Sequence, residues 1–493
     1  MPGQQGERSV SRRILAACLS LPSLTLAALI IFALYHSVLR AWMKRTGFKV
    51  GALEWRRQYV PFYANPHSDP WLSWWLVPAL VIAVLFLLLI RRLYLRGALR
   101  PALLLPVTMV FFVAISASVA MIDGTHTEKG GKIPALLSPY TRVRYEYYGD
   151  APKVATNGLV AFLGNYAKPA FFKTLSGHAQ THPPGGSVFQ WLASLPFGHN
   201  LWSAAVFTIL FTATAILPVF LLARLLYGDT IARWSLALFP LVPSFQLFTS
   251  TCMDGPFSVF PIWTIYLFHK AMASPRKLPW AILTGIAMAA GMFMSYTSFF
   301  IGLFFAVTLA FTLLLDRRRF AEMLTVLIVA ATVFAICYVL LFLTTDFSII
   351  DALNAAVNKD HSMMGKHGTS PDQYLNMGMA NLAAFLAGVG FSLAVAWWKE
   401  CTASLRACVT GRSVCDIYVL AFPVALLTIS YANLFHSEVE RIWIFMVPFL
   451  VIPAAKYLHN LCSSRASLLP FYWVAITMAV QLLAMEAILK FPW

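Results

Sequence analysis

Residues 321–343 read AEMLTVLIVAATVFAICYVLLFL, with Glu322 as the only charged side chain. A helix rises about 1.5 Å per residue, so this run is long enough to cross a hydrocarbon core of about 30 Å. Comparable apolar runs occupy residues 76–90, 103–122 and 201–222. Within lipid every backbone amide needs a partner inside the chain, and an unbroken run of this length finds one only as a helix. The sequence therefore predicts an all-α, polytopic integral membrane protein.

The composition of the whole chain agrees with these runs. Of 493 residues, 59% are hydrophobic and 12% are charged, whereas soluble domains carry roughly 25% charged residues. A soluble fold is excluded on this ground. A transmembrane barrel would consist of alternating segments of about ten residues, and the chain shows no such alternation. Its seven cysteines have no CxxC spacing, so the sequence indicates neither a disulfide framework nor a zinc site.

The net charge of +17 comes largely from basic residues in short loops between the apolar runs. Such loops are typically cytoplasmic, so the charge marks membrane orientation rather than nucleic-acid binding. One segment, residues 40–57, is basic yet falls on the opposite side in this scheme. The residues that set the orientation are Arg91, Arg92, Arg96, Arg100, Arg224, Arg233, Lys270, Arg276, Lys277, Arg317, Arg318, Arg319, Lys399, Arg406, Arg412, Lys456 and Arg465.

These loops and runs predict about thirteen transmembrane helices, with the N-terminus in the cytoplasm. We divide the chain into a two-helix N-terminal extension (1–100), a core (101–460) and a C-terminal helix (461–493). The core includes an external loop, 123–200, whose aromatic residues favour short helices on the membrane surface near 154–166 and 187–194. The predicted helices are 14–36, 71–90, 101–122, 201–224, 232–250, 256–272, 280–295, 297–315, 320–343, 376–397, 414–432, 443–459 and 469–489.

In this arrangement, ionisable and imidazole side chains gather on the non-cytoplasmic face. Ionisable groups at membrane depth are costly, so several on one face predict a functional site. The alternative is that each one merely ends a helix at the interface. The residues are Asp123, Glu146, Asp150, His178, His182, Asp254, Glu438, Glu440 and Arg441.

The chemistry of these residues suggests separate roles. Two prolines after His182 force an extended backbone, and Gly185 and Gly186 allow a sharp turn, so the loop can hold an imidazole rigidly. The planar guanidinium of Arg441 suits a phosphate, although an arginine paired with its neighbours would look the same. An aspartate at this face can deprotonate a hydroxyl, or can simply be solvated or cap a helix. His126, Glu128 and His178 lack the spacing of a metal site.

The order of these features resembles the GT-C superfamily of membrane glycosyltransferases, in its protein-mannosyltransferase and aminoarabinose-transferase-like branch. A helix ending in Asp123 precedes the external loop, His182-Pro183-Pro184-Gly185 follows, and Asp254 comes next. The resemblance extends over residues 101–460. It implies that an acidic residue of the first large external loop is the catalytic base. The family's usual Asp-Glu pair is missing, because Gly124 follows Asp123 and Ala151 follows Asp150, so both aspartates stay open as the base; we favour Asp123.

The resemblance implies an inverting glycosyltransferase that takes sugar from a polyprenyl-phosphate donor. The acceptor, a glycan, lipid or protein, lies outside the cytoplasm, and the protein belongs in a bacterial inner membrane. We expect Asp123, Asp150 and Asp254 as catalytic candidates, and no required cofactor, with a divalent cation left open. The alternatives are a transporter or flippase and a polymerase or ligase of surface polysaccharide. The expected substrate-binding residues are Glu146, His178, His182, Glu438, Glu440 and Arg441.

Overall fold

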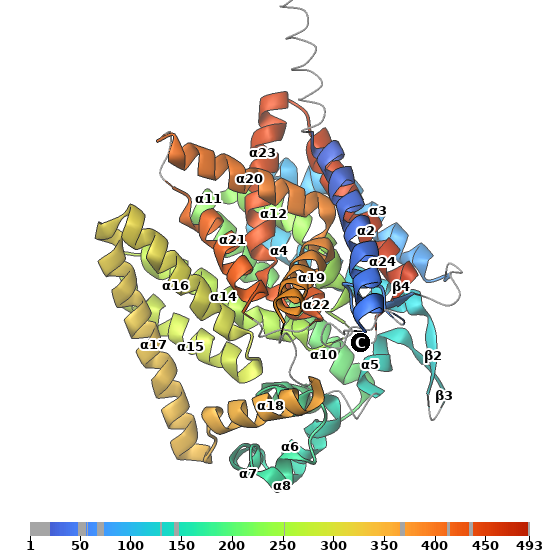
Figure 1. Cartoon of the computed structure of the whole chain (residues 1–493), viewed down its shortest axis with the longest axis vertical. Helices are drawn as coiled ribbons and strands as arrows, with labels where there is room; N and C mark the ends of the chain where they lie inside the picture. The colour runs from blue at the N-terminus through green and yellow to red at the C-terminus, as the bar shows by residue number, and fades with distance from the viewer. Residues whose placement is uncertain are drawn as a thin grey trace, which may run out of the picture.

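The computed structural model describes most of the chain. Helices dominate, with two two-stranded sheets, so the predicted all-α class is confirmed. The helices form an elongated bundle, with several short helices gathered at one end (Figure 1). The described residues are 20–47, 56, 58–66, 73–128, 131–141, 147–250, 252–364, 370–411, 415–432 and 437–491.

Within the described residues, nine helices are long and apolar enough to cross a membrane, or ten if one bent pair forms a single crossing. The predicted count of thirteen is not confirmed, although other helices of the bundle are compatible with it. Some predicted spans are divided into shorter helices. The predicted span 232–250 consists of α12 (Asp229–Leu238), η6 (Phe239–Leu241) and α13 (Pro243–Leu247). The nine are Leu21–Thr46 (α2), Leu76–Leu95 (α3, η1), Pro101–Asp123 (α4, η2), Leu201–Tyr227 (α10, α11), Lys277–Met294 (α15), Ser298–Leu315 (α16), Arg317–Thr345 (α17), Ile444–Arg465 (η7, α23) and Leu469–Ile488 (α24).

The bent pair corrects the predicted straight span 376–397. Helices α19 (Pro371–Val389) and α20 (Phe391–Val409) meet at 106°. Gly390 between them has φ +111°, a conformation that residues with a Cβ rarely adopt. The break frees backbone groups, and Gln481 satisfies two of them: its Oε1 accepts from the Phe391 amide (3.0 Å), and its Nε2 donates to the Ala387 carbonyl (2.6 Å). The periodicity of the sequence does not reveal a bend that depends on a side chain about 90 residues away.

Short helices cover one end of the bundle, as the sequence predicts for the external loop (Figure 1). Buried aromatic side chains, including Phe162, Tyr166 and Phe347, join this layer to the helices below it. The layer consists of η4 (Tyr147–Asp150), α6 (Ala151–Asn157), α7 (Leu159–Asn165), α8 (Pro169–Phe172), η5 (Ala179–Thr181), α9 (Gly185–Ser194) and α18 (Ile349–Met364).

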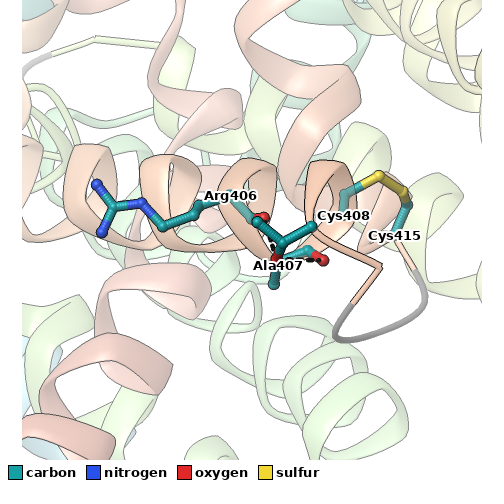
Figure 2. The surroundings of a disulfide bond; sticks show 5 residues. Arg406, Ala407, Cys408 and Cys415 are labelled. Carbon is teal, nitrogen blue, oxygen red and sulfur yellow. Dashed lines mark hydrogen bonds between the residues drawn. A yellow bond between two sulfur atoms is a disulfide. The ribbon is translucent and has the colours of Figure 1, made fainter.

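The opposite end of the bundle carries a network of charges and a disulfide. Lys456 of α23 contacts Glu400 of α20 (2.9 Å) and Asp416 (2.8 Å), which precedes α21 (Ile417–Ser430). The Cys408–Cys415 disulfide, which the cysteine spacing did not indicate, lies just beyond (Figure 2). The bond ties the end of α20 to the residue before Asp416. It therefore fixes the loop that supplies one partner of Lys456.

The packing of α9 generates a test of the fold. A Cβ added at Gly185 would lie 2.2 Å from the Phe293 carbonyl oxygen, whereas one added to Gly302 in α16 would meet nothing closer than 3.9 Å. Because backbone cannot rotate away as a side chain can, Gly185→Ala should lower stability by about 1–3 kcal/mol. Gly302→Ala should keep or slightly raise it. Thermal unfolding in detergent measures both, and equal unfolding temperatures would contradict this packing.

Candidate functional site

The loop before α9 holds His182 in a defined orientation. Its Nδ1 lies 3.1 Å from the carbonyl oxygen of His178. A carbonyl oxygen only accepts, so Nδ1 carries the proton and Nε2 of the neutral ring is left as an acceptor. The hydroxyl of Tyr166 lies within hydrogen-bond distance of the carbonyl oxygens of Ala179 (2.5 Å) and His182 (3.0 Å), and so contacts the backbone of this loop as well. The extended backbone that the two prolines predict is present at His182, which has φ −129° and ψ 166°.

Burial affects the charge of His182. Removal from water lowers its pKa from 6.5 to about 4, and His178 and Arg441 contribute in the same direction. The negative charge of Asp254 opposes the shift but does not cancel it. The ring is therefore neutral at physiological pH and available as a hydrogen-bond partner rather than as a cation.

Arg441 lies between two carboxylates. Its Nη1 donates to Asp254 Oδ2 (2.8 Å) and its Nη2 to Glu438 Oε2 (2.7 Å). Asp254 begins α14 (Asp254–Ala273), where the helix dipole favours a negative charge. Glu438 has φ +63° and precedes α22 (Val439–Ile442), the one-turn helix that carries Arg441. The side chains of Arg441, Asp254 and Glu438 are 9, 7 and 14% exposed, so the pairing replaces solvation for all three.

Glu440 points to a different partner. Its Oε1 accepts a hydrogen bond from the Tyr63 amide (2.7 Å), and the residue is 1% exposed. Burial raises the pKa of this carboxyl to about 7, although the hydrogen bond from Tyr63 lowers it in part. Glu440 therefore connects the arginine-bearing turn to the N-terminal extension rather than to Asp254.

Asp150 is held within the layer of short helices. The Nζ of Lys153 donates to its Oδ1 (2.7 Å), and the amide of Ser176 lies 3.2 and 3.0 Å from its two oxygens. The residue is 1% exposed. These contacts link η4 to the segment before η5, so Asp150 stabilises the fold of this layer.

Asp123 lies at the end of the α4 span, with a side chain 15% exposed and 3.9 Å from His126 Nε2. Two turns earlier in α4, Ser116 donates to the carbonyl of Gln246 (3.5 Å) and accepts from Ser250 (3.3 Å). Asp254, at the start of α14, follows Ser250 by four residues in the sequence. The buried Glu486 of α24 also interacts electrostatically with Asp123.

The structure thus brings together part of the expected set. His182, Asp254, Glu438 and Arg441 form one group, named here the arginine cluster. Glu440 adjoins it through its neighbour in sequence, whereas Asp150 and Asp123 have other partners. Glu146 lies outside the described residues.

Sequence reasoning missed the aromatic wall beside His182. The rings of Tyr147 and Phe257 both lie 5.9 Å from the imidazole, and 5.6 Å from each other. Tyr147 also contacts His178, at 6.1 Å. Phe257 is three residues after Asp254, a spacing that places both on one face of a helix. That spacing was available in the sequence, whereas the packing of Tyr147 depends on the fold of the external loop.

No three His, Cys, Asp or Glu side chains in the described ranges lie close enough together to hold a metal ion. The expectation that no cofactor is required stays a prediction, and so does the allowance for a divalent cation.

The lowered pKa of His182 has a measurable consequence. The unfolded imidazole titrates near 6.5 and the folded one near 4, so protons bind the unfolded chain more readily between these values. Stability from this residue is present above pH 6.5 and is lost as the pH falls towards 4. The unfolding temperature of the wild type should therefore fall more steeply than that of His182→Gln between pH 7 and pH 5. Parallel pH dependence of the two proteins would contradict this result.

Comparison with known proteins finds a family model that matches part of the chain. Residues 181–342 match the family model described as dolichyl-phosphate-mannose-protein mannosyltransferase. This third of the chain starts one residue before His182 and contains Asp254. No curated protein matches the sequence significantly.

Three solved structures are similar to this one at low identity. An Archaeoglobus fulgidus oligosaccharyltransferase with Zn and sulfate has 14% identity and a TM-score of 0.47, over 77% of this chain and 53% of that chain. The archaeal oligosaccharyltransferase AglB from the same organism, with an inhibitory peptide and a dolichol-phosphate, has 14% identity and a TM-score of 0.44, over 78% and 56%. ArnT from Cupriavidus metallidurans bound to undecaprenyl phosphate has 12% identity and a TM-score of 0.48, over 77% of each chain.

This chain thus spans about half the length of the archaeal structures. Over residues 181–342, the match to the protein-mannosyltransferase family model agrees with the predicted resemblance.

Proposed function

We propose that this protein is an inverting glycosyltransferase that moves a sugar from a polyprenyl-phosphate carrier to an acceptor outside the cytoplasm. The observation that carries the proposal is the arginine cluster. Segments around residues 182, 254 and 440, far apart in the chain, meet at one end of a membrane bundle. Two of these three segments lie within the family match.

In the proposed reaction, Arg441 neutralises the departing lipid phosphate. The acceptor hydroxyl loses its proton to a carboxylate, and its oxygen attacks the anomeric carbon from the face opposite the phosphate. The bond from the anomeric carbon to the phosphate oxygen breaks, and its electron pair leaves with the carrier. Charge-assisted contacts to that phosphate stabilise the transition state. Glu438 is the more exposed partner of Arg441, so it is the carboxylate that would yield to the phosphate.

For the base we propose Asp123 rather than Asp150. Both oxygens of Asp150 already accept from the chain around them, through Lys153 and Ser176. Asp123 is more exposed and is mounted at the end of a long helix. Rigid elements hold a reacting group more precisely than loops do.

We propose that the arginine cluster faces the outside of a bacterial inner membrane. The start of α17 and the ends of α20 and α23, which carry basic residues, lie away from the external layer in Figure 1. The Cys408–Cys415 disulfide lies at that same end, although disulfides are rare in the cytosol. We give the basic loops more weight, because several separate loops agree, whereas the disulfide joins one pair of cysteines seven residues apart.

A transporter would explain two other features, the bent α19–α20 pair and the charges around Lys456. In the structure, the polar groups at the bend and the charge of Lys456 have partners within the protein. Gln481 bonds to the chain on either side of the bend, and Lys456 is paired with Glu400 and Asp416. Neither feature calls for a transported ion or solute, so transfer explains the site better.

Asparagine variants of the three aspartates test the base. Asparagine keeps the shape but not the basic oxygen, so Asp123→Asn should reduce turnover about 10²–10⁴-fold with donor affinity nearly unchanged. Asp150→Asn should mainly lower thermal stability, because it weakens the contact with Lys153. Asp254→Asn should weaken donor binding through Arg441. Turnover of a polyprenyl-phosphate-linked sugar by purified protein is the measurement. Near-normal turnover in all three variants would remove the carboxylate-base mechanism.

Variants of Arg441 test the phosphate contact. Losing one charge-assisted contact costs about 1.5–3 kcal/mol, which is about 10- to 150-fold in binding. Arg441→Ala should show this loss for a polyprenyl-phosphate, and Arg441→Lys a smaller one, since lysine lacks the fork. Arg406→Ala, an exposed cation at the other end of the bundle (Figure 2), is the matched control. If Arg441→Ala bound the lipid as the control does, Arg441 would not contact the phosphate.

A further inference from the structure

The described residues 59–66, named here the strap, join the N-terminal extension to the arginine-bearing turn. The amide of Tyr63 donates to Glu440 Oε1 (2.7 Å), across 377 residues of sequence. Glu440 immediately precedes Arg441, so this hydrogen bond acts on the same short turn that presents the guanidinium. The extension is thus in direct contact with the part of the chain that carries the proposed phosphate ligand.

The strap is itself fixed on both sides of Tyr63. On one side, Val60 is fully buried and its carbonyl lies 2.5 Å from His36 Nδ1 of α2. On the other side, β1 (Asn65–Pro66) pairs with β4 (Leu489–Lys490) at the end of α24. Phe62 and Ala64 are also buried, 4 and 0% exposed. A donor held this firmly can define the position of its acceptor.

The turn that receives this hydrogen bond needs an external tether. Helix α22 contains four residues, and a single helical turn is not stable by itself. The residues that precede it, Ser437 and Glu438, have φ of +147° and +63°, which is unfavourable backbone for side chains with a Cβ. Local sequence therefore does not fix the direction in which Arg441 projects.

Glu440 makes this tether with one oxygen. Its Oε2 has no hydrogen-bond partner among the described residues, and its Cβ packs against Gly388, where an added Cβ would lie 3.2 Å away. The hydrogen bond from Tyr63 therefore needs only an oxygen acceptor on residue 440, and does not need a negative charge there. The raised pKa of the carboxyl is consistent with that, because burial disfavours the charged form.

We infer that Glu440 is a positioning residue, which sets the orientation of Arg441 by accepting the Tyr63 amide, so that the strap of the N-terminal extension is part of the transferase site. The inference rests on the proposed function for its consequence in catalysis. It replaces the expectation that Glu440 binds substrate, and it gives the N-terminal extension a role.

Two pairs of full-length variants test this inference. Glu440→Gln keeps an oxygen acceptor and loses the charge, whereas Glu440→Ala loses both. Tyr63→Pro removes the amide donor, whereas Tyr63→Ala keeps it and loses only the ring. Size-exclusion and thermal unfolding in detergent establish that each variant is folded, and the Glu440 pair decides the matter alone if Tyr63→Pro does not fold.

The first readout is turnover of a polyprenyl-phosphate-linked sugar, separated into kcat and donor KM. Loss of a buried hydrogen bond should reduce kcat/KM about tenfold in Glu440→Ala and Tyr63→Pro, chiefly through donor KM. Glu440→Gln and Tyr63→Ala should stay within about threefold of the wild type. A Glu440→Gln variant as impaired as Glu440→Ala would overturn the inference, since the charge would then be required.

The second readout does not depend on activity. Hydrogen–deuterium exchange at Tyr63 and at residues 437–443 should quicken in Glu440→Ala and stay slow in Glu440→Gln. Unchanged exchange in Glu440→Ala would overturn the inference even if the enzyme were impaired. If the wild type transferred no sugar while exchange followed this pattern, the proposed function would fail and the positioning role of Glu440 would stand.

Discussion

The pairing of Arg441 with Asp254 and Glu438 is the constraint on which the rest of the site depends. A guanidinium that is 9% exposed loses most of its hydration, and breaking a buried pair typically costs about 3–5 kcal/mol. The start of α14 and the turn at α22 must therefore remain within hydrogen-bond distance. That requirement ties two helices of the core together at the face where His182 and its aromatic neighbours also lie.

The same principle governs the bundle beyond the site. Gln481 at the α19–α20 bend and Lys456 at the far end have partners that come from other segments of the chain. Since water cannot satisfy these groups in the membrane core, each such contact selects one packing of helices over others. The bend at Gly390 thus depends both on a glycine that can adopt φ +111° and on the distant side chain of Gln481.

The difference between local features and contacts of distant segments explains what could be predicted from the sequence. Apolar length decides whether a segment is a membrane helix, so the polytopic class and most helices follow from the sequence alone. The rigid loop around His182 also follows, because the conformational limits of proline are local. Contacts such as Tyr63 to Glu440 or Asp150 to Ser176 depend on which loops meet in space. Glu440 and Arg441 are adjacent in sequence, and only the contacts made in the fold distinguish the residue that accepts from Tyr63 from the residue that pairs with Asp254.

The arginine cluster has a charge balance that bears on how a phosphate could enter it. One guanidinium faces two carboxylates, and His182 is neutral at physiological pH. A lipid phosphate would add negative charge to a group that already carries an excess of it, so binding requires one carboxylate to move away. Asp254 is the first residue of a twenty-residue helix and is the more buried of the two. Glu438 lies in strained backbone beside a one-turn helix, so its departure disturbs less structure. In the proposed reaction Glu438 therefore acts as the exchangeable partner, while Asp254 retains Arg441 and the strap holds its turn in place.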